Sequence, residues 1–156
     1  MMQRVRRESP KLPVSLEVEK LREGMDQLFP LAHLLLVSSD FMRQSGCEQD
    51  ELLQILRQQA PDADIVLMLG KEGAIGLTQQ GKYYRQQAFS PDKVVDTLAA
   101  GDTFNAGIID GLCRNHDLKN AMRFAARLAG NKCGQSGLHG LEIPAYTATE
   151  SGNDRY

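Results

Sequence analysis

A short turn of small residues carries the side chains best suited to chemistry in this chain. It extends from Asp96 to Gly107 and includes the run Ala100-Gly101-Asp102, which precedes an apolar helical pattern. Small side chains let backbone N–H groups approach an anion, and the positive end of a helix favours negative charge. Asp102 is suited to taking a proton from a hydroxyl that attacks a phosphate. The turn therefore predicts a phosphate site with a general base. The alternative is that Asp102 is only an acidic residue of the first helical turn, where the helix dipole favours a negative charge.

A second glycine-rich stretch begins at Gly70, continues through Lys71, Glu72 and Gly73, and ends at Gly76. Its glycines permit a tight turn at which a base, ribose or phosphate could approach the backbone. It lacks both the Gly-Lys-Ser/Thr ending of a P-loop and the Rossmann glycine pattern. A plain structural turn after a strand is the alternative to a nucleotide contact.

Apolar periodicity predicts strands alternating with helices. The expected strands are 14–18, 34–37, 65–69 and 94–95, together with a hairpin of 75–78 and 83–85. The expected helices are 21–29, a segment marked by 52–56, 104–112 and 118–129, the last capped by Asp117. This order is typical of an α/β protein with a mostly parallel sheet flanked by helices, where ligands lie beyond the carboxyl ends of strands.

The composition narrows the class of protein. The chain has 156 residues, of which 42% are hydrophobic, so it can bury a core. A formal net charge of −2 argues against nucleic acid or an anionic membrane as a partner. No apolar run reaches the roughly 18 residues of a membrane span, and the first residues lack a signal peptide's apolar region. Three cysteines without a close pair, and three histidines without ligand spacing, favour the reducing cytoplasm over a disulfide or zinc site.

The two ends of the chain differ from its middle. Residues 1–11 are expected to be a frayed terminus, and residues 147–156 a flexible polar tail. No Pro- or Ser-rich linker divides the part between them, so residues 12–146 are expected to form one folded portion.

The turn that begins at Asp96 resembles the second signature of the ribokinase-like, or PfkB-type, carbohydrate kinases. That signature is written Asp-Thr-x-Gly-Ala-Gly-Asp-x-Phe, and this chain reads Asp-Thr-Leu-Ala-Ala-Gly-Asp-Thr-Phe over residues 96–104. The segments 14–20, 123–125 and 129–134 extend the resemblance and are most similar to the ketohexokinase branch. The resemblance covers roughly residues 12–144 and implies the carboxyl-terminal part of a ribokinase-like fold.

The resemblance implies ATP-dependent phosphorylation of a sugar hydroxyl, with fructose or a related ketose as substrate and Mg²⁺ accompanying the nucleotide. Asp102 matches the family's catalytic base, which also contacts the sugar. The N–H groups of Ala99, Ala100, Gly101 and Asp102 match the anion hole around the transferred phosphoryl group.

Other matched positions concern the nucleotide and cations. Gly70, Lys71, Glu72 and Gly73 match a segment that contacts ATP. Cys133 lies near the matched adenine pocket, and a buried packing cysteine is the alternative for it. Asp96 and the backbone of Leu98 match positions that hold a monovalent cation, K⁺, in many members.

The chain departs from the family pattern at two places. Ala99 stands where most members have Gly, so its methyl group could crowd the anion hole or restrict φ. The run Ala-Ala-Gly-Asp is similar to that of some ribokinases, so the change is expected to be tolerated. The family's Asn-x-x-Glu element, which organises metal and phosphate, aligns with residues 37–40, where Asp40 keeps a carboxylate and the Asn is lost.

The family's amino-terminal half, which carries the sugar-binding signature, has no counterpart in these residues. Two functional hypotheses follow. In the first, the chain supplies the nucleotide site and catalytic base of a sugar kinase. In the second, it is an inactive remnant that binds nucleotide or associates with itself. A lone half would expose a sheet edge and apolar surface, which predicts self-association, including a homodimer.

Overall fold

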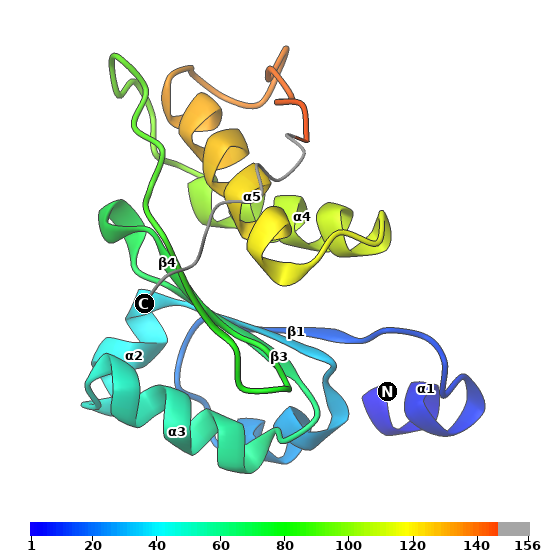
Figure 1. Ribbon diagram of the computed structural model, residues 1–156. Helices are drawn as coiled ribbons and strands as arrows, with labels where there is room; N and C mark the ends of the chain where they lie inside the picture. Colours follow the sequence, from blue (N-terminus) through cyan, green and yellow to red (C-terminus); the bar gives the residue numbers. More distant parts are fainter. Residues whose placement is uncertain (147–156) are drawn as a thin grey trace. The chain divides into compact units, whose positions relative to one another are not determined.

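The computed structural model describes residues 1–146, and the tail expected at 147–156 lies outside them. The chain divides into two compact units, one of residues 1–87 and one that begins at Ala88 (Figure 1). The division falls just after a hairpin strand and needs no Pro- or Ser-rich linker. Within residues 1–146, no helix is long and apolar enough to cross a membrane.

The first unit is built on a five-stranded sheet whose strands follow the order of the sequence, β1-β2-β3-β4-β5. The strands are β1 (Ser15–Val18), β2 (Leu34–Val37), β3 (Asp64–Met68), β4 (Ala74–Leu77) and β5 (Tyr83–Gln86). β1, β2 and β3 are parallel, and β4 and β5 form the antiparallel hairpin. The predicted mostly parallel sheet with a small hairpin is therefore confirmed.

Helices cover one face of this sheet. They are α2 (Ser39–Ser45), α3 (Gln49–Gln59) and the 3-10 helix η1 (Met25–Leu31), with α2 and α3 on the same side in Figure 1. α3 buries Leu52, Leu53 and Leu56 from one stripe of its surface. These side chains share a core with Leu35 of β2 and Ile65 of β3. This shared core fixes the strands, and the strands position the loops that follow them.

The amino-terminal part of the first unit differs from the sequence prediction in two places. The prediction of a helix that begins at Leu21 is wrong, because Leu21 is 57% exposed and only η1 forms. η1 begins after Gly24, which has a φ of +73°. The left-handed glycine explains why the helical spacing fails to continue backwards. In the segment expected to fray, α1 (Met2–Glu8) forms a helix with no buried residue, supported by the Arg4–Glu8 pair at 2.9 Å.

The second unit is built on two helices, α4 (Ala100–Cys113) and α5 (Leu118–Cys133), joined by a short turn. The Asp117 side chain accepts a hydrogen bond from the Asn120 amide at 2.8 Å, which confirms the predicted cap of α5. The helices pack very closely where glycine meets alanine. A Cβ atom on Gly107 would lie 2.8 Å from the Cα of Ala125.

The chain beyond α5 is held against this helix pair by Tyr146. Its ring stacks on Phe124 and on His116, with centroids 3.9 and 4.2 Å away. Its hydroxyl donates to Asp110 at 2.9 Å, and burial together with this carboxylate raises the pKa of Tyr146 to about 12. The second unit therefore has its own packed interior.

Candidate active site

Helix α4 begins without a side-chain cap. Its N-cap residue is Ala99, which has no polar side chain, whereas Ser38 caps α2 and Asp117 caps α5. Ala99 adopts a left-handed conformation at φ +61°. The helix starts at Ala100, four residues before the predicted start at 104, so Asp102 lies inside its first turn. No side chain therefore caps the first-turn donors of α4.

Three of the four backbone amides expected in the anion hole remain available. The Ala100 amide donates to the Thr97 carbonyl at 3.2 Å, so one amide expected in the anion hole is already used. The amides of Ala99, Gly101 and Asp102 have no acceptor within residues 1–146. A Cβ atom built on Gly101 meets nothing within 4 Å, so its surroundings are open. The Asp102 carboxylate beside these donors is exposed.

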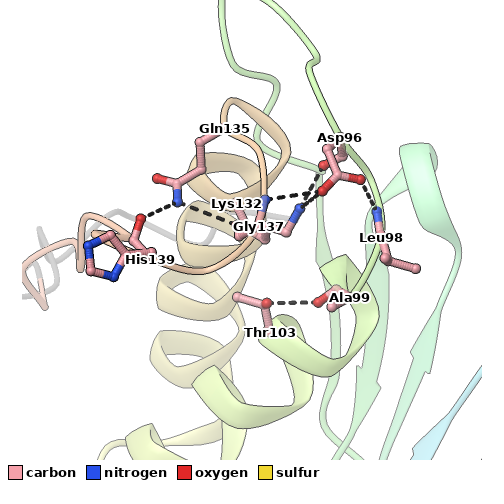
Figure 2. A network of polar contacts seen from close by, with 8 residues as sticks. All are labelled: Asp96, Leu98, Ala99, Thr103, Lys132, Gln135, Gly137 and His139. Carbon is pink, nitrogen blue, oxygen red and sulfur yellow. Dashed lines mark hydrogen bonds and ion pairs between the residues drawn. The ribbon is translucent and has the colours of Figure 1, made fainter.

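Asp96 holds the segment that leads into α4 (Figure 2). Its Oδ1 accepts from the Leu98 amide at 2.9 Å, which closes a local Asx-type turn. Its Oδ2 lies 2.7 Å from the Lys132 Nζ and accepts from the Gly137 amide at 3.3 Å. These bonds, led by that from Lys132, lower the pKa of Asp96 to about 2. Asp96 is therefore a charged junction between the turn, the end of α5 and the following loop.

The sequence analysis did not single out Lys132 or Gly137. The apolar residues of α5 include Ala121, Ala125 and Leu128, and the same helical spacing reaches Lys132. A lysine on an apolar face requires a carboxylate partner, so this spacing was a usable signal. Nothing in the sequence marks the Gly137 amide as a partner of Asp96.

The predicted strand at 94–95 is wrong. Val94 and Val95 are 59% and 51% exposed, and no strand forms there. The Val95 and Asp96 amides instead donate to the Cys133 carbonyl, at 2.7 and 3.3 Å. The last carbonyls of a helix lack intrahelical partners, so the end of α5 offers these amides an acceptor that replaces a strand partner. Cys133 thus contributes its backbone here, and its side chain is partly buried.

The other glycine-rich stretch forms a tight turn between β3 and β4 in the first unit. Gly70 and Gly73 have φ values of +60° and +95°, which explains the need for glycine at both positions; η2 (Gly70–Glu72) begins at Gly70 and ends just before Gly73. The Gly73 carbonyl accepts from the Leu69 amide at 2.8 Å. Lys71 and Glu72 are exposed and accessible to a ligand. The structure explains the turn, and its contact with ATP stays a prediction.

Asp40, the remaining carboxylate of the altered element, lies in the first turn of α2 and pairs with Arg43. Within the described residues, no three His, Cys, Asp or Glu side chains cluster in a way that could hold a metal ion. Asp40 is therefore tied to its own helix.

The comparisons with known proteins place the uncapped helix end, the exposed carboxylate and the glycine turn within a matched family region. Residues 3–144 match the family described as pfkB family carbohydrate kinase. The chain belongs to this family. The predicted resemblance is thus confirmed for the PfkB family.

Individual carbohydrate kinases are also similar to this chain in sequence. The chain is 36% identical to ketohexokinase of Mus musculus over 149 residues, which cover 90% of this chain and 50% of that protein. It is 33% identical to 2-dehydro-3-deoxygluconokinase of Haemophilus influenzae over 119 residues, covering 72% of this chain and 37% of that protein. The chain therefore spans about half the length, or less, of these curated relatives.

Solved structures establish the fold. Ribokinase of Arabidopsis thaliana, complexed with ribose and ATP, superposes with a TM-score of 0.70 at 24% identity, covering 87% of this chain and 45% of that one. A Burkholderia thailandensis nucleoside kinase complexed with inosine gives 0.72 at 18% identity, covering 93% and 47%. The ribokinase-like fold predicted from the sequence is confirmed.

The left-handed Ala99 predicts a stabilising substitution. Ala99→Gly is expected to raise the free energy of unfolding by about 0.5–1 kcal/mol, because relief of left-handed strain outweighs the greater freedom of glycine in the unfolded chain. Ala100→Gly, at the first helical residue, is the matched control and is expected to lower it. Urea unfolding of both variants measures the difference. A loss of stability in Ala99→Gly would show that the backbone at this position carries no strain.

Proposed function

We propose that this chain carries the phosphate-binding turn and the catalytic base of an ATP-dependent sugar kinase, with fructose or a related ketose as acceptor. Membership of the PfkB family and the similarity to ketohexokinase support this class of reaction. The observation that carries the proposal is the uncapped start of α4. There, open amides at Gly101 and Asp102 adjoin the exposed Asp102 carboxylate.

The chemistry of this turn suits phosphoryl transfer. The Gly101 and Asp102 amides donate hydrogen bonds to the transferred phosphoryl group, and the dipole of α4 adds favourable electrostatics. A single donor of this kind is worth about 3 kcal/mol in a comparable oxyanion site. Asp102 accepts the proton of the sugar hydroxyl as that oxygen attacks. A base whose carboxylate is exposed can reach a bound hydroxyl without displacing a protein partner.

The other nucleotide contacts are proposed on the family resemblance. Gly70, Lys71, Glu72 and Gly73 would contact ATP through an exposed turn, and Cys133 would lie near the adenine. Mg²⁺ bound with ATP supplies charge neutralisation on the phosphates.

Gly101 provides a test that separates binding from folding. Gly101→Val is expected to keep or raise the free energy of unfolding, because the added side chain meets nothing within 4 Å and glycine is a poor helix former. The same side chain fills the space that the phosphate needs, so the affinity for MgATP should fall at least about tenfold, the equivalent of 1.4 kcal/mol. Calorimetric titration with MgATP and urea unfolding are the two measurements.

The control is Ala106→Val, which adds a branched side chain at an exposed position of the same helix. It should leave MgATP affinity unchanged. Equal affinity in Gly101→Val and the unmodified chain would refute a phosphate site at this turn.

An inactive nucleotide-binding remnant is the second candidate. The chain would then bind MgATP and form no ADP when fructose is added. Fructose-dependent ADP formation by the chain alone would exclude this candidate.

A further inference from the structure

The side chain of Lys132 is 1% exposed, although it carries an ammonium group. It lies in the last turn of α5, and its Nζ is 2.7 Å from Asp96 Oδ2 and 3.0 Å from the Asp96 main-chain oxygen. Removing an ammonium from water costs several kcal/mol unless close partners compensate. Both partners that the structure gives to Nζ belong to one residue, which points to a role for the ammonium at Asp96.

The ammonium acts on the turn that precedes α4. Asp96 uses Oδ2 and its carbonyl for Lys132 and uses Oδ1 for the Leu98 amide at 2.9 Å. Leu98 is followed directly by Ala99, the left-handed residue at which α4 begins. Lys132 therefore holds in place the Asp96 carboxylate that closes the turn. The turn leads directly into α4 and so orients its first amides.

A K⁺ ion does not fit these residues. The family resemblance predicts that Asp96 and the backbone of Leu98 hold a monovalent cation. Both carboxylate oxygens of Asp96 already accept hydrogen bonds, Oδ2 from the Lys132 Nζ at 2.7 Å and Oδ1 from the Leu98 amide at 2.9 Å, so a metal ion at Asp96 would have to bind beside the ammonium. A second cation at that distance would be repelled and would compete for the same oxygens.

We propose that Lys132 is a built-in cation, which takes the place of a monovalent metal ion at Asp96 and positions the turn of residues 96–99 without K⁺. Lys132 is a positioning residue, because it acts through Asp96 and does not touch the proposed phosphate site. That Lys132 takes the place of K⁺ rests only on the contacts of its ammonium group with Asp96. Its relevance to phosphate binding rests on the proposed function.

The experiment uses the chain and Lys132→Ala, each in potassium, ammonium or tetramethylammonium chloride at about 0.15 M ionic strength. Hydrogen exchange at the Leu98 and Gly137 amides reports the turn directly, because both donate to Asp96. Arg127→Ala, which removes an exposed charge from the same helix, is the matched control. No nucleotide is present, so the outcome is independent of the proposed function.

The unmodified chain and Arg127→Ala should show the same exchange in all three salts. In Lys132→Ala, the two amides should exchange at least about tenfold faster in tetramethylammonium chloride, because the Asp96 carboxylate loses its charged partner. Potassium or ammonium, which are small enough to enter the vacated space, should restore protection.

Three results would overturn the proposal. The first is protection of the unmodified chain that rises specifically with potassium. The second is a Lys132→Ala variant that matches the unmodified chain in tetramethylammonium chloride. The third is a folded Lys132→Ala variant that no small cation protects. If Lys132→Ala does not fold, a potassium titration of the unmodified chain decides alone: indifference to potassium supports the built-in cation, and a specific response refutes it.

Discussion

Asp102→Asn is expected to lower the kcat for fructose phosphorylation by about 10²–10⁴-fold, the usual contribution of a general base. The measurement is made on a protein that contains an amino-terminal, sugar-binding half together with these residues. Asparagine keeps the size of the side chain and cannot accept the hydroxyl proton. MgATP affinity should be unchanged or higher, because the substitution removes a negative charge beside the phosphates. Steady-state kinetics and calorimetry of the same protein separate these two effects.

The control for this prediction is Asp50→Asn. Asp50 lies in the first turn of α3, so its substitution removes the same favourable interaction with a helix dipole. It has no place in the proposed site and should leave kcat unchanged. If Asp102→Asn retained near-normal turnover, Asp102 would be an ordinary first-turn acid like Asp50, and the catalytic proposal would fail.

The sequence predicts the parts of this fold whose signals are local. The continuous apolar runs at Leu34–Val37 and in β3 identify buried strands because parallel strands have little polar alternation. Asp117 identifies the start of α5 because its carboxylate caps the helix within three residues. The turn at 96–107 identifies the PfkB family because small residues and a carboxylate have a fixed order there.

The failures occur where distant residues decide the local structure. Val94 and Val95 have the composition of a strand, but the carbonyl of Cys133, almost 40 residues later, captures the Val95 amide. The partnership of Asp96 with Lys132 likewise depends on how α5 ends beside the turn. Periodicity within one segment can indicate that Lys132 lies on the apolar face of its helix. It cannot identify Asp96, in another segment, as the carboxylate that neutralises it.

Gly107, the last residue of the opening motif, has a role that the sequence does not reveal. From its position it could be one more small residue around the phosphate. In the structure it lies on the side of α4 that faces α5, where a Cβ atom would be 2.8 Å from Ala125 Cα and 3.0 Å from Ala125 Cβ. The nearest obstacle is backbone, which cannot move aside as a flexible side chain could. Gly107 therefore permits the close packing of α4 on α5.

Gly107→Val is accordingly expected to lower the free energy of unfolding of the second unit by about 3 kcal/mol, the upper range for overpacking in a core. Ala106→Val, one residue earlier and exposed, adds the same type of side chain with little effect on stability. Urea unfolding and hydrogen exchange of the α4 and α5 amides distinguish the two variants. Because α4 carries the Gly101 and Asp102 amides, Gly107→Val should also weaken MgATP binding, although it lies more than one helical turn from them. A Gly107→Val variant as stable as Ala106→Val would show that the helices can separate without loss. The spacing of α4 from α5 would then not hold the phosphate turn in place.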